Sequence, residues 1–438
     1  MPENIYKDKV VSVEKALECI RSGDNIVTAV AAGEAREFFT NLHTIADRVK
    51  GVRVCTCLNM GNYEYIVNPA YKESFFSDAW FYTATYRAAH DNGNMSYVPN
   101  HLHLAVDGKL AHRKPTVFVA MASMPDKHGY MSLMSNAYEK QLMRYCDRVI
   151  LEINPNCPRI FGDNQIHVSD ATHLIEVNYE VPELPDIPAT ETDRKIAGFI
   201  APLIEDGSCL QLGIGGTPAA VAELLYDKND LGVHTEMFTT AMAQLAKAGV
   251  INGKCKQMDR ELHVATFVLG TKELYDFVND NPSVRVMTGN TTINPRIIRY
   301  NDKQISINAG LAADLTGQIC SESVGSVHFS GTGGQADTAR GAVLSKGGKS
   351  FIAFHSTAMS RDPETGAKVR ISRITPQLAP GSAVSLQRND VQYVVTEYGI
   401  VNLQGMNIQE RCEALIGISH PDFRDGLREE AGKLKLIF

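Results

Sequence analysis

The chain has 438 residues, a length typical of two or three domains of average size. The same length also allows two large domains. Hydrophobic residues make up 44% and charged residues 21%, which are ordinary globular values and exclude a disordered chain. The 43 Lys and Arg residues are outnumbered by 50 Asp and Glu residues, giving a net charge of −7. Without an overall basic field we expect no nucleic-acid partner, and an anionic ligand must be held by local groups such as backbone amides.

Membrane and targeting signals are missing from the sequence. No apolar run approaches the roughly 18 residues that a membrane helix requires, and the first residues lack the apolar stretch of a signal peptide. The nine cysteines are odd in number and scattered along the chain. These patterns predict a cytoplasmic protein with reduced thiols and no membrane partner.

The spacing of cysteines and histidines does not indicate a metal site. Cys55 and Cys57 share one face of a strand-like segment, but no second Cys or His pair follows to complete a zinc site. His101 and His103 are two positions apart, without nearby acidic residues, and are expected to be surface or core side chains. We therefore expect no bound metal.

The part of the chain before residue 180 alternates strand-like and helix-like segments. Ser12 is a candidate N-cap for a short helix that ends near Gly23. We predict helices over residues 13–20, 37–50 and 140–146, and strands over residues 25–31, 52–58, 115–121 and 148–153. This alternation is typical of an α/β fold with parallel sheets.

A proline-rich segment divides the chain. Residues 180–188 contain three prolines, which fit neither a helix interior nor a central strand. We therefore predict two domains, over residues 1–187 and 188–438. In the second we predict a helix over residues 193–204 and strands over residues 208–212, 233–235, 263–269, 284–287, 304–308, 327–330, 350–355 and 391–396. Two related α/β domains would suit a site between them.

A glycine-rich turn follows the first strand of the second half. The segment Leu-Gly-Ile-Gly-Gly-Thr-Pro begins at Leu212, and Pro218 suits the first turn of a helix. Glycines at 213, 215 and 216 let backbone amides approach a ligand, and the helix N-terminus favours negative charge. The turn is neither a dinucleotide fingerprint nor a phosphate-binding P-loop. On its own it fits an anion site and an unliganded turn equally well.

Two glutamates end short strands. Glu236 comes just before a predicted helix over residues 239–247, at the end of a strand where parallel sheets collect ligands. A carboxylate there can act as base, metal ligand or nucleophile, although it also suits the first turn of a helix. Glu397 has a similar setting and is its rival.

A second glycine-rich segment covers residues 329–337. Its Ser-Gly-Thr-Gly-Gly run permits a nest of amides for an oxyanion, and its alternative reading is a flexible loop. Asn308, at the end of another predicted strand, could either bind a ligand or cap its turn.

Five motifs in this order are far more specific than any one of them. They begin at Ile204, Leu231, Ser330, Val394 and Ser419. Together they resemble the acetyl-CoA hydrolase/transferase family, closest to the 4-hydroxybutyrate CoA-transferases and their butyrate-type relatives. The resemblance implies two α/β domains of the CoA-transferase type, with the active site at their interface.

The resemblance also implies the roles of individual residues. The nucleophile of the family's His-Ser/Thr-Glu-Met motif is here Glu236, which ranks it above Glu397. No cofactor is bound permanently; coenzyme A enters as a substrate, as acyl-CoA, with small carboxylates as the other partners. The resemblance assigns the turn of residues 211–215 to CoA contacts and places the loop of residues 331–334 beside the thioester. The predicted CoA-binding residues are Gln211, Leu212, Gly213, Ile214, Gly215, Gly216, Asn308, Gly331, Gly333 and Gly334.

The sequence departs from the family pattern in three places. The turn reads Gly-Gly-Thr-Pro from Gly215, where relatives often have Gly-Ala-Ile-Pro or Gly-Asn-Ile. Met359 stands where relatives tend to carry a CoA-contacting lysine, and Arg361 is a candidate substitute. The segment from Ala31 to Arg36 lacks the proline of the 4-hydroxybutyrate type, which leaves the acyl preference open.

The predicted reaction moves CoA from a short-chain acyl-CoA to a carboxylate such as acetate, through a glutamyl-CoA thioester. Alternatives are an acyl-CoA hydrolase, a transferase for a dicarboxylate such as succinate or itaconate, and a non-catalytic CoA- or nucleotide-binding protein. Arg36 is a candidate partner for a distal carboxylate, and Tyr63 and Glu64 for a substrate hydroxyl. Enzymes of this size are often homodimers or higher oligomers, and we expect the same here.

Overall fold

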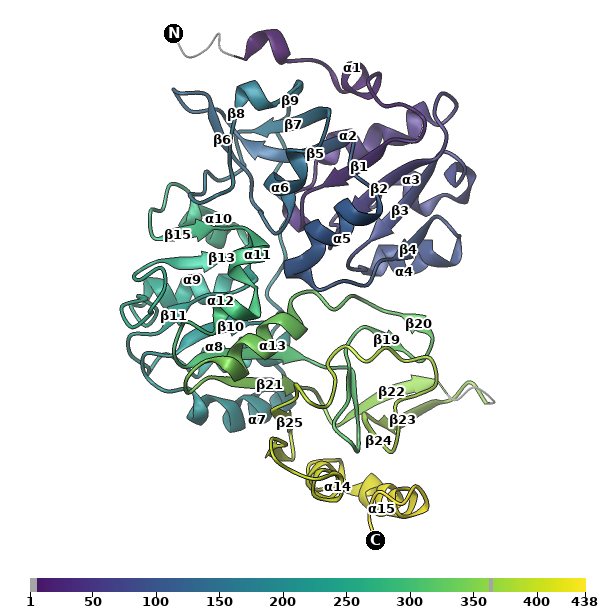
Figure 1. The fold of residues 1–438 in the computed structure, drawn as a ribbon, viewed down its shortest axis with the longest axis vertical. Helices are drawn as coiled ribbons and strands as arrows, with labels where there is room; N and C mark the ends of the chain where they lie inside the picture. Colours follow the sequence, from purple (N-terminus) through teal and green to yellow (C-terminus); the bar gives the residue numbers. More distant parts are fainter. Residues whose placement is uncertain (1–5, 362–364) are drawn as a thin grey trace.

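The structure is a computed structural model that describes residues 6–361 and 365–438. It contains two large sheets, one above the other in Figure 1, each covered by helices. The upper sheet is built from residues before 177 and the lower sheet from residues after 208. The expected α/β architecture with parallel-rich sheets is confirmed.

Seven strands form the first sheet, in the order β4-β3-β2-β1-β5-β7-β9, and all neighbours are parallel. Their bounds are β1 (Asn25–Thr28), β2 (Val52–Thr56), β3 (Phe75–Ala79), β4 (Met95–Tyr97), β5 (Val117–Ser123), β7 (Arg148–Asn154) and β9 (His173–Glu176). All seven residues of β5 are buried because helices cover both faces of the sheet. The helices are α1 (Val13–Leu17), α2 (Arg36–Asn41), α3 (Glu64–Val67), α4 (Ala84–Asp91), α5 (Ala105–His112) and α6 (Glu139–Met143). A hairpin-like pair joins β6 (Tyr130–Ser132) to β8 (Gln165–His167).

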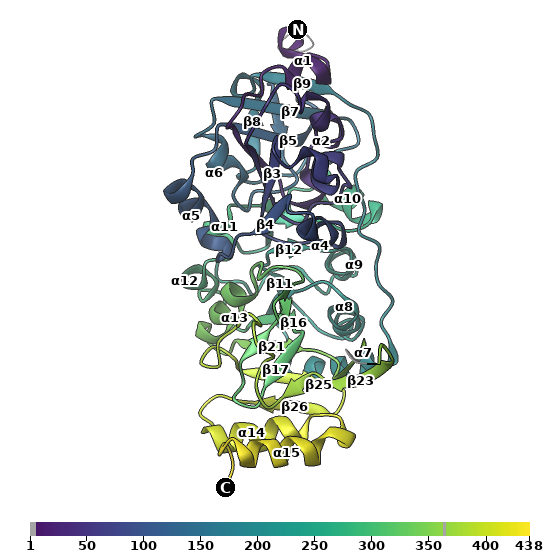
Figure 2. The same ribbon diagram turned by 90° about the vertical axis from the view of Figure 1, so that its right-hand side faces the viewer.

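Six strands form the second sheet, in the order β11-β10-β16-β21-β25-β26, and all neighbours except β25 and β26 are parallel. Their bounds are β10 (Cys209–Leu212), β11 (Gly232–Val233), β16 (Gln304–Ala309), β21 (Lys349–Ala353), β25 (Tyr393–Thr396) and β26 (Gly399–Asn402). Figure 2 shows α8 (Gly216–Glu223) and α9 (Thr240–Lys247) on one side of this sheet and α12 (Pro295–Ile298) and α13 (Gln335–Leu344) on the other.

Smaller elements surround the second sheet. The helices are α7 (Glu191–Ile200), α10 (Lys272–Val278), α11 (Gly289–Thr292), α14 (Ile408–Gly417) and α15 (Arg424–Lys433). The short strands are β12 (Met237–Phe238), β13 (His263–Ala265), β14 (Phe267–Val268), β15 (Val284–Val286), β17 (Ala312–Asp314), β18 (Ile319–Cys320), β19 (Ser323–Val324), β20 (Val327–His328), β22 (Thr357–Arg361), β23 (Lys368–Ser372) and β24 (Ile374–Thr375). None of the helices within the described residues has the length and apolarity needed to cross a membrane.

The strand order reverses once in each sheet. In the first sheet β1 lies between β2 and β5, and in the second β10 lies between β11 and β16. In open α/β sheets ligands bind outside the carboxyl ends of the strands at such a reversal. Both reversals are therefore places to look for a site.

The proline-rich segment runs along one side of the molecule from β9 to α7 (Figure 2). Residues 177–190 form no helix or strand. The segment is tied to the second half by a 2.9 Å hydrogen bond from Leu184 N–H to the Gly270 carbonyl and a 2.6 Å bond from the Tyr275 hydroxyl to the Pro182 carbonyl. The predicted domain boundary at residue 187 falls within this stretch and stays a prediction.

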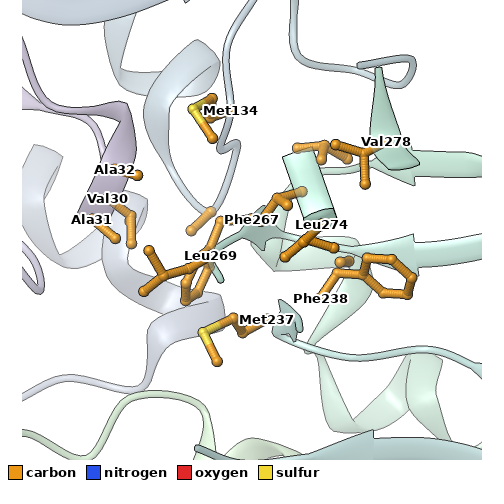
Figure 3. Close-up of a cluster of buried hydrophobic side chains, with 14 of the residues drawn as sticks. Val30, Ala31, Ala32, Met134, Met237, Phe238, Phe267, Leu269, Leu274 and Val278 are labelled. Atoms are coloured by element: carbon orange, nitrogen blue, oxygen red, sulfur yellow. The ribbon is translucent and has the colours of Figure 1, made fainter. Parts of the chain in front are cut away.

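A continuous hydrophobic core joins the two halves. Figure 3 shows Val30, Ala31 and Ala32, which follow β1, facing Phe267 and Leu269 of the second half. The Asn136 N–H also donates a 2.7 Å hydrogen bond to the Thr266 carbonyl across the same junction. The halves are thus packed against each other rather than merely connected.

Several predicted elements have different bounds in the structure. The helix predicted over residues 37–50 is α2 followed by a short 3-10 turn, and the strand predicted over 263–269 is divided into β13 and β14. That strand divides at Thr266, because both its N–H and that of Phe267 turn aside to bond the Glu236 carbonyl. The β22–β23 hairpin was not predicted, because its exposed strands have no buried apolar face.

Candidate active site

Glu236 lies between the two sheets, three residues after the end of β11 and directly before β12. Its backbone is held firmly: its carbonyl accepts hydrogen bonds from Thr266 N–H at 2.9 Å, Phe267 N–H at 3.1 Å and the Thr266 hydroxyl at 2.7 Å. With the main chain fixed in this way, the side chain leaves the strand edge in a defined direction. That direction is toward a pocket between the two halves.

The Glu236 carboxylate meets the second glycine-rich segment. The Gly334 N–H donates a 2.8 Å hydrogen bond to Oε2 of Glu236. Burial raises the pKa of Glu236 to about 7, while this hydrogen bond acts to lower it and the charge of Asp337 adds to the rise. The carboxyl group therefore changes its protonation state near neutral pH.

The pocket in front of Glu236 has a volume of about 210 Å³ and mostly apolar walls. Val30, Cys57, Leu58, Phe81 and Leu102 come from the first half. The other lining residues come from the second half: Gln211, Leu212, Gly213, Ile214, Met237, Phe267, Asn308, Ala309, Ser321, Ser330, Gly331, Thr332, Gly333, Gly334 and Gln335. Glu236 is the only charged residue among those that the described part of the chain contributes to this lining.

The first glycine-rich turn, which joins β10 to α8, lines the same pocket. The Gly213 N–H donates a 2.9 Å hydrogen bond to the Ile307 carbonyl, which holds the turn against β16. Gly215 has φ +118°, a backbone conformation that residues with a side chain rarely adopt. A Cβ on Gly216 would lie 2.5 Å from Oδ2 of Asp193, so a larger residue there would require the Asp193 side chain to move.

Asp193 anchors this turn from beneath. It completes a capping box with Thr190 at the start of α7, and it accepts a 2.7 Å bond from the Thr217 hydroxyl and lies 2.9 Å from His355 Nε2. Although burial acts to raise it, the hydrogen bonds from Thr190, Thr217 and His355 lower the pKa of Asp193 to about 2. One ionised carboxylate thus links α7, the glycine turn and the end of β21.

Two amide side chains line the pocket beside Glu236. Ser306 donates a 2.8 Å hydrogen bond to Gln211 Oε1, and Asn308 Nδ2 donates a 2.9 Å bond to the Ser306 hydroxyl. This network fixes the orientation of both amides. It presents neutral donors and acceptors to a ligand without adding charge.

The loop of residues 331–334 is shaped by close contacts. A Cβ on Gly331 would lie 2.6 Å from the Trp80 carbonyl, and one on Gly334 would lie 2.5 Å from Oε2 of Glu236. Gly333 has φ +53 and is also close to the carboxylate. The glycines are needed here because the backbone touches both halves of the molecule.

A second hollow of about 280 Å³ continues the pocket past the first glycine-rich turn. It shares Leu212, Gly213, Ile214 and Met237 with the first and extends to residues 184–187 of the proline-rich segment. Gly215 lines this second hollow, whereas Gly216 lines neither.

The structure does not bring the three predicted substrate residues to either hollow. Arg36 is exposed at the start of α2, with its guanidinium 5.1 Å from the centre of the Tyr179 ring. Tyr63 is buried against Phe39 and Tyr65. Glu64 faces solvent and accepts a 3.2 Å hydrogen bond from the side chain of Asn68, the C-cap residue of α3. The geometry gives their predicted contacts with substrate no support.

Two other predicted candidates also lie elsewhere. Glu397 accepts hydrogen bonds from the Ser356 N–H at 2.8 Å and hydroxyl at 2.6 Å, so it holds the chain before β22. Arg361 is exposed at the end of β22 and lines neither hollow, and its substitution for the family's lysine stays a prediction.

His101 and His103, which were expected from the sequence to be surface or core side chains, both contact Asp337. His101 Nδ1 lies 3.1 Å and His103 Nδ1 2.9 Å from Oδ1 of this buried carboxylate at the start of α13. Although burial acts to raise it, these bonds hold the pKa of Asp337 below its ordinary value. Among the residues described, no group of three His, Cys, Asp or Glu side chains is arranged to hold a metal.

The apolar residues of the first half that line the pocket were not identified from the sequence. Val30, Leu58 and Phe81 each follow a strand of the first sheet by two residues, at its carboxyl end. That position was the available signal, because parallel sheets gather ligands there. Glu322, a buried carboxylate that bonds to the glycine loop, had no signal in the sequence.

Comparison with known proteins agrees with this geometry. Residues 2–186 match the acetyl-CoA hydrolase/transferase N-terminal domain and residues 270–431 the C-terminal domain. The 4-hydroxybutyrate coenzyme A transferase of Clostridium kluyveri is 41% identical over 98% of this chain and 99% of its own. The succinyl-CoA:cyclohexane-1-carboxylate CoA transferase of Geobacter metallireducens is 39% identical over 99% of this chain and 98% of its own.

Solved structures are similar over the same extent. RipA from Yersinia pestis superposes with a TM-score of 0.91 at 34% identity, covering 100% of both chains. A 4-hydroxybutyrate CoA-transferase from Porphyromonas gingivalis has a TM-score of 0.80 at 33% identity, covering 99% of this chain and 100% of its own. By sequence and by fold, the chain belongs to the acetyl-CoA hydrolase/transferase family.

Proposed function

We propose that this protein is a CoA-transferase that moves CoA between a short-chain acyl-CoA, of the 4-hydroxybutyryl or butyryl type, and a carboxylate such as acetate. The observation that carries the proposal is the position of Glu236. Its carboxylate faces an apolar pocket that the first glycine-rich turn also lines, and it accepts the Gly334 N–H.

The first half-reaction begins with the Glu236 carboxylate attacking the thioester carbonyl of acyl-CoA. The carbon–sulfur bond breaks, giving an acyl-glutamyl anhydride and CoA thiolate. The thiolate then attacks the glutamyl carbonyl, which releases the original carboxylate and leaves a glutamyl-CoA thioester. No general base is needed, because both nucleophiles are anions when they attack.

The second half-reaction reverses these steps with a new acid. The acceptor carboxylate attacks the glutamyl-CoA carbonyl, expels CoA thiolate and forms a second anhydride. The thiolate attacks the acceptor's carbonyl, so the new acyl-CoA leaves and the Glu236 carboxylate is regenerated. One product thus leaves before the second substrate reacts, which is ping-pong kinetics.

The protein's part in these steps is electrostatic and steric. Each tetrahedral intermediate carries an oxyanion, and the nearby donors are amides of the loop of residues 331–334 and of the turn that follows Gly213. The apolar walls limit the water that would hydrolyse the anhydride and the thioester. We infer that the second hollow takes the pantetheine arm, since it continues the pocket through Ile214.

The charge of the pocket favours a monocarboxylic acyl group. Among the described residues that line it, none is Lys or Arg, and Arg36 points elsewhere. A dicarboxylate such as succinate would leave its distal carboxylate without a cation. A panel of acyl-CoA donors with acetate as acceptor tests this, and a higher kcat/KM for succinyl-CoA than for butyryl-CoA would contradict it.

The covalent intermediate gives the direct test of the proposal. Incubation with butyryl-CoA alone should add the mass of CoA less one water to the peptide that contains Glu236. Glu236→Ala should form no adduct and lose transfer, whereas Glu429→Ala, which removes an exposed carboxylate of α15, should behave as wild type. Absence of the adduct from the wild type would contradict the proposal.

Hydrolysis shares the same intermediate and is separated from transfer by its acceptor. Loss of acyl-CoA should depend on added acetate if the protein is a transferase. An equal rate without acetate would identify a hydrolase.

We also infer that the protein is a cytoplasmic homo-oligomer. The unpaired cysteines support the compartment, and the frequency of symmetric assemblies among enzymes supports the oligomer. Sedimentation of the purified chain measures its oligomeric state.

A further inference from the structure

A closed ring of hydrogen bonds lies behind the loop of residues 331–334. The Thr332 N–H donates to the Tyr97 hydroxyl at 3.2 Å, and that hydroxyl donates to Oε2 of Glu322 at 2.8 Å. The Thr332 hydroxyl lies 3.0 Å from both oxygens of the same carboxylate. Thr332 is therefore held through both its main chain and its side chain, two residues before Gly334.

Glu322 is the centre of this arrangement. Its side chain is buried, and Oε1 also accepts a 2.8 Å bond from the Ser385 hydroxyl. Its backbone carbonyl accepts the N–H groups of Phe329 at 2.7 Å and Ser330 at 3.1 Å. One residue thus holds both the approach to the glycine loop and its middle, yet it does not line the pocket.

The first half of the chain takes part in holding the same loop. Tyr97 is the last residue of β4, the edge strand of the first sheet. The Tyr82 N–H donates a 3.1 Å bond to the Ser330 carbonyl, and Arg87 donates a 2.9 Å bond to the Phe329 carbonyl. The loop that belongs to the second half is therefore attached to the first.

We propose that Glu322 and Tyr97 are positioning residues that hold the loop of residues 331–334 so that the Gly334 N–H faces Glu236. The proposal rests on the function proposed above. Amides that stabilise developing charge must be oriented before the reaction, and a displaced donor is lost to the transition state. A buried carboxylate that accepts three hydroxyls fixes the loop more rigidly than a glycine-rich sequence could by itself.

The variants that test this remove one contact at a time. Tyr97→Phe deletes only the hydroxyl, and Glu322→Gln removes the charge. Thr332→Val removes the Thr332 hydroxyl at nearly constant volume, whereas Thr332→Ser keeps it. We expect kcat to fall roughly ten- to a hundredfold in the first three, with KM for acyl-CoA changed by less than about threefold. Thr332→Ser should retain more of the wild-type kcat than Thr332→Val, because it keeps the hydroxyl that bonds to Glu322. Tyr86→Phe, at another buried tyrosine of the first half, is the matched control.

The pH profile distinguishes positioning from support of the fold. The Gly334 hydrogen bond acts to lower the pKa of Glu236, so a displaced loop should raise the apparent pKa of kcat/KM above that of the wild type. Loss of thermal stability alone would not move this pKa. If Glu322→Gln does not fold, Tyr97→Phe and the Thr332 pair give the same test.

The outcomes also separate this inference from the proposed function. A wild type that forms no glutamyl-CoA adduct contradicts the function itself. A wild type that forms the adduct, together with folded Tyr97→Phe and Thr332→Val variants that form it at the same rate with the same pH profile, overturns only the role of Glu322 and Tyr97. Slower adduct formation with a raised apparent pKa supports that role.

Discussion

Gly334 lies so close to Glu236 that a methyl group on its Cα would be 2.5 Å from the carboxylate oxygen Oε2. The same residue donates its N–H to that oxygen at 2.8 Å. The contact therefore needs both a backbone donor and the absence of a side chain. It connects the start of α13 to the residue directly before β12, and these two elements are far apart in the sequence.

Gly334→Ala is expected to lower kcat by about a hundredfold or more, because either the carboxylate or the amide must move. The fold should persist, since the change is confined to the pocket. Steady-state kinetics with butyryl-CoA and acetate, together with circular dichroism, check both points. Gly426→Ala, at a helical glycine with nothing within 4 Å of the added methyl group, should keep wild-type kcat. Equal rates in the two variants would contradict the contact's importance.

The rate of the first half-reaction should depend on the ionisation of Glu236. Only the carboxylate attacks the thioester, and burial raises the pKa of this group to about 7. We expect kcat/KM for acyl-CoA to fall about tenfold per unit as the pH decreases below about 7. Return to about pH 8 should restore activity, which excludes acid unfolding as the cause. A rate that stays constant down to about pH 5 would contradict the raised pKa.

Glu236→Gln should make the protein more stable at alkaline pH. The pKa is about 7 in the folded protein against an ordinary value of 4.5, so the folded state binds the proton more tightly than the unfolded state does. The wild type's free energy of unfolding therefore decreases as the pH rises from about 4.5 to about 7, and stays lower above that.

The neutral amide of Glu236→Gln does not titrate, so the variant avoids this loss. We expect a gain of about 1 to 3 kcal/mol at about pH 8 that shrinks toward about pH 5, measured by urea unfolding. Glu429→Gln, at an exposed position, should show no such gain. If Glu236→Gln and the wild type had equal free energies of unfolding at about pH 8, folding would not raise the pKa of Glu236.

Asp193→Ala is expected to raise KM for acyl-CoA more than it lowers kcat. The change removes the carboxylate under the first glycine-rich turn and the capping box of α7, at a loss of about 1 to 3 kcal/mol in the free energy of unfolding. Glu191→Ala, at an exposed site in the same helical turn, is the control. A change in kcat alone would contradict a role in CoA binding.

The stability that Asp193 contributes should also depend on pH. Its pKa is lowered from 3.8 to about 2, so the contribution is fully present above about pH 4 and is lost as the pH falls through about 2. Urea unfolding of wild type and Asp193→Ala should therefore converge at the acid end of this window. A difference that stays constant with pH would mean that the charge of Asp193 does not stabilise the fold.

The alternation of strands and helices was predictable because fully buried parallel strands are continuous apolar runs. The segment that became β5 is of this kind. It was predicted to within a few residues, as were β7 and β16, whose buried strands also include polar residues. Prediction was poorer where local contacts oppose the pattern. The apolar run from His263 divides at Thr266 because the backbone there bonds to Glu236, a contact that periodicity does not contain.

The candidate site was predictable to the extent that its residues lie in motifs. Glu236, Gly213 and Gly334 line one pocket, and the catalytic and CoA-binding roles that the resemblance implies for them stay predictions. Arg36 and Glu64 were chosen for their chemistry alone, and their helices direct them to solvent. The chemical type of a side chain limits what it can bind, but the direction of its Cα–Cβ bond determines which groups it can contact.

The sequence by itself determined the order of strands and helices, the proline-rich division and the positions of the glycine-rich turns, because these depend on residues that are neighbours along the chain. Only the tertiary structure determined that Val30 and Leu58 line the pocket of Glu236. It also determined that Tyr97 of the first half donates a hydrogen bond to Glu322 of the second half. Such contacts arise when two separately built sheets bury a common apolar surface. Their partners are therefore set by packing over long chain separations rather than by any local pattern.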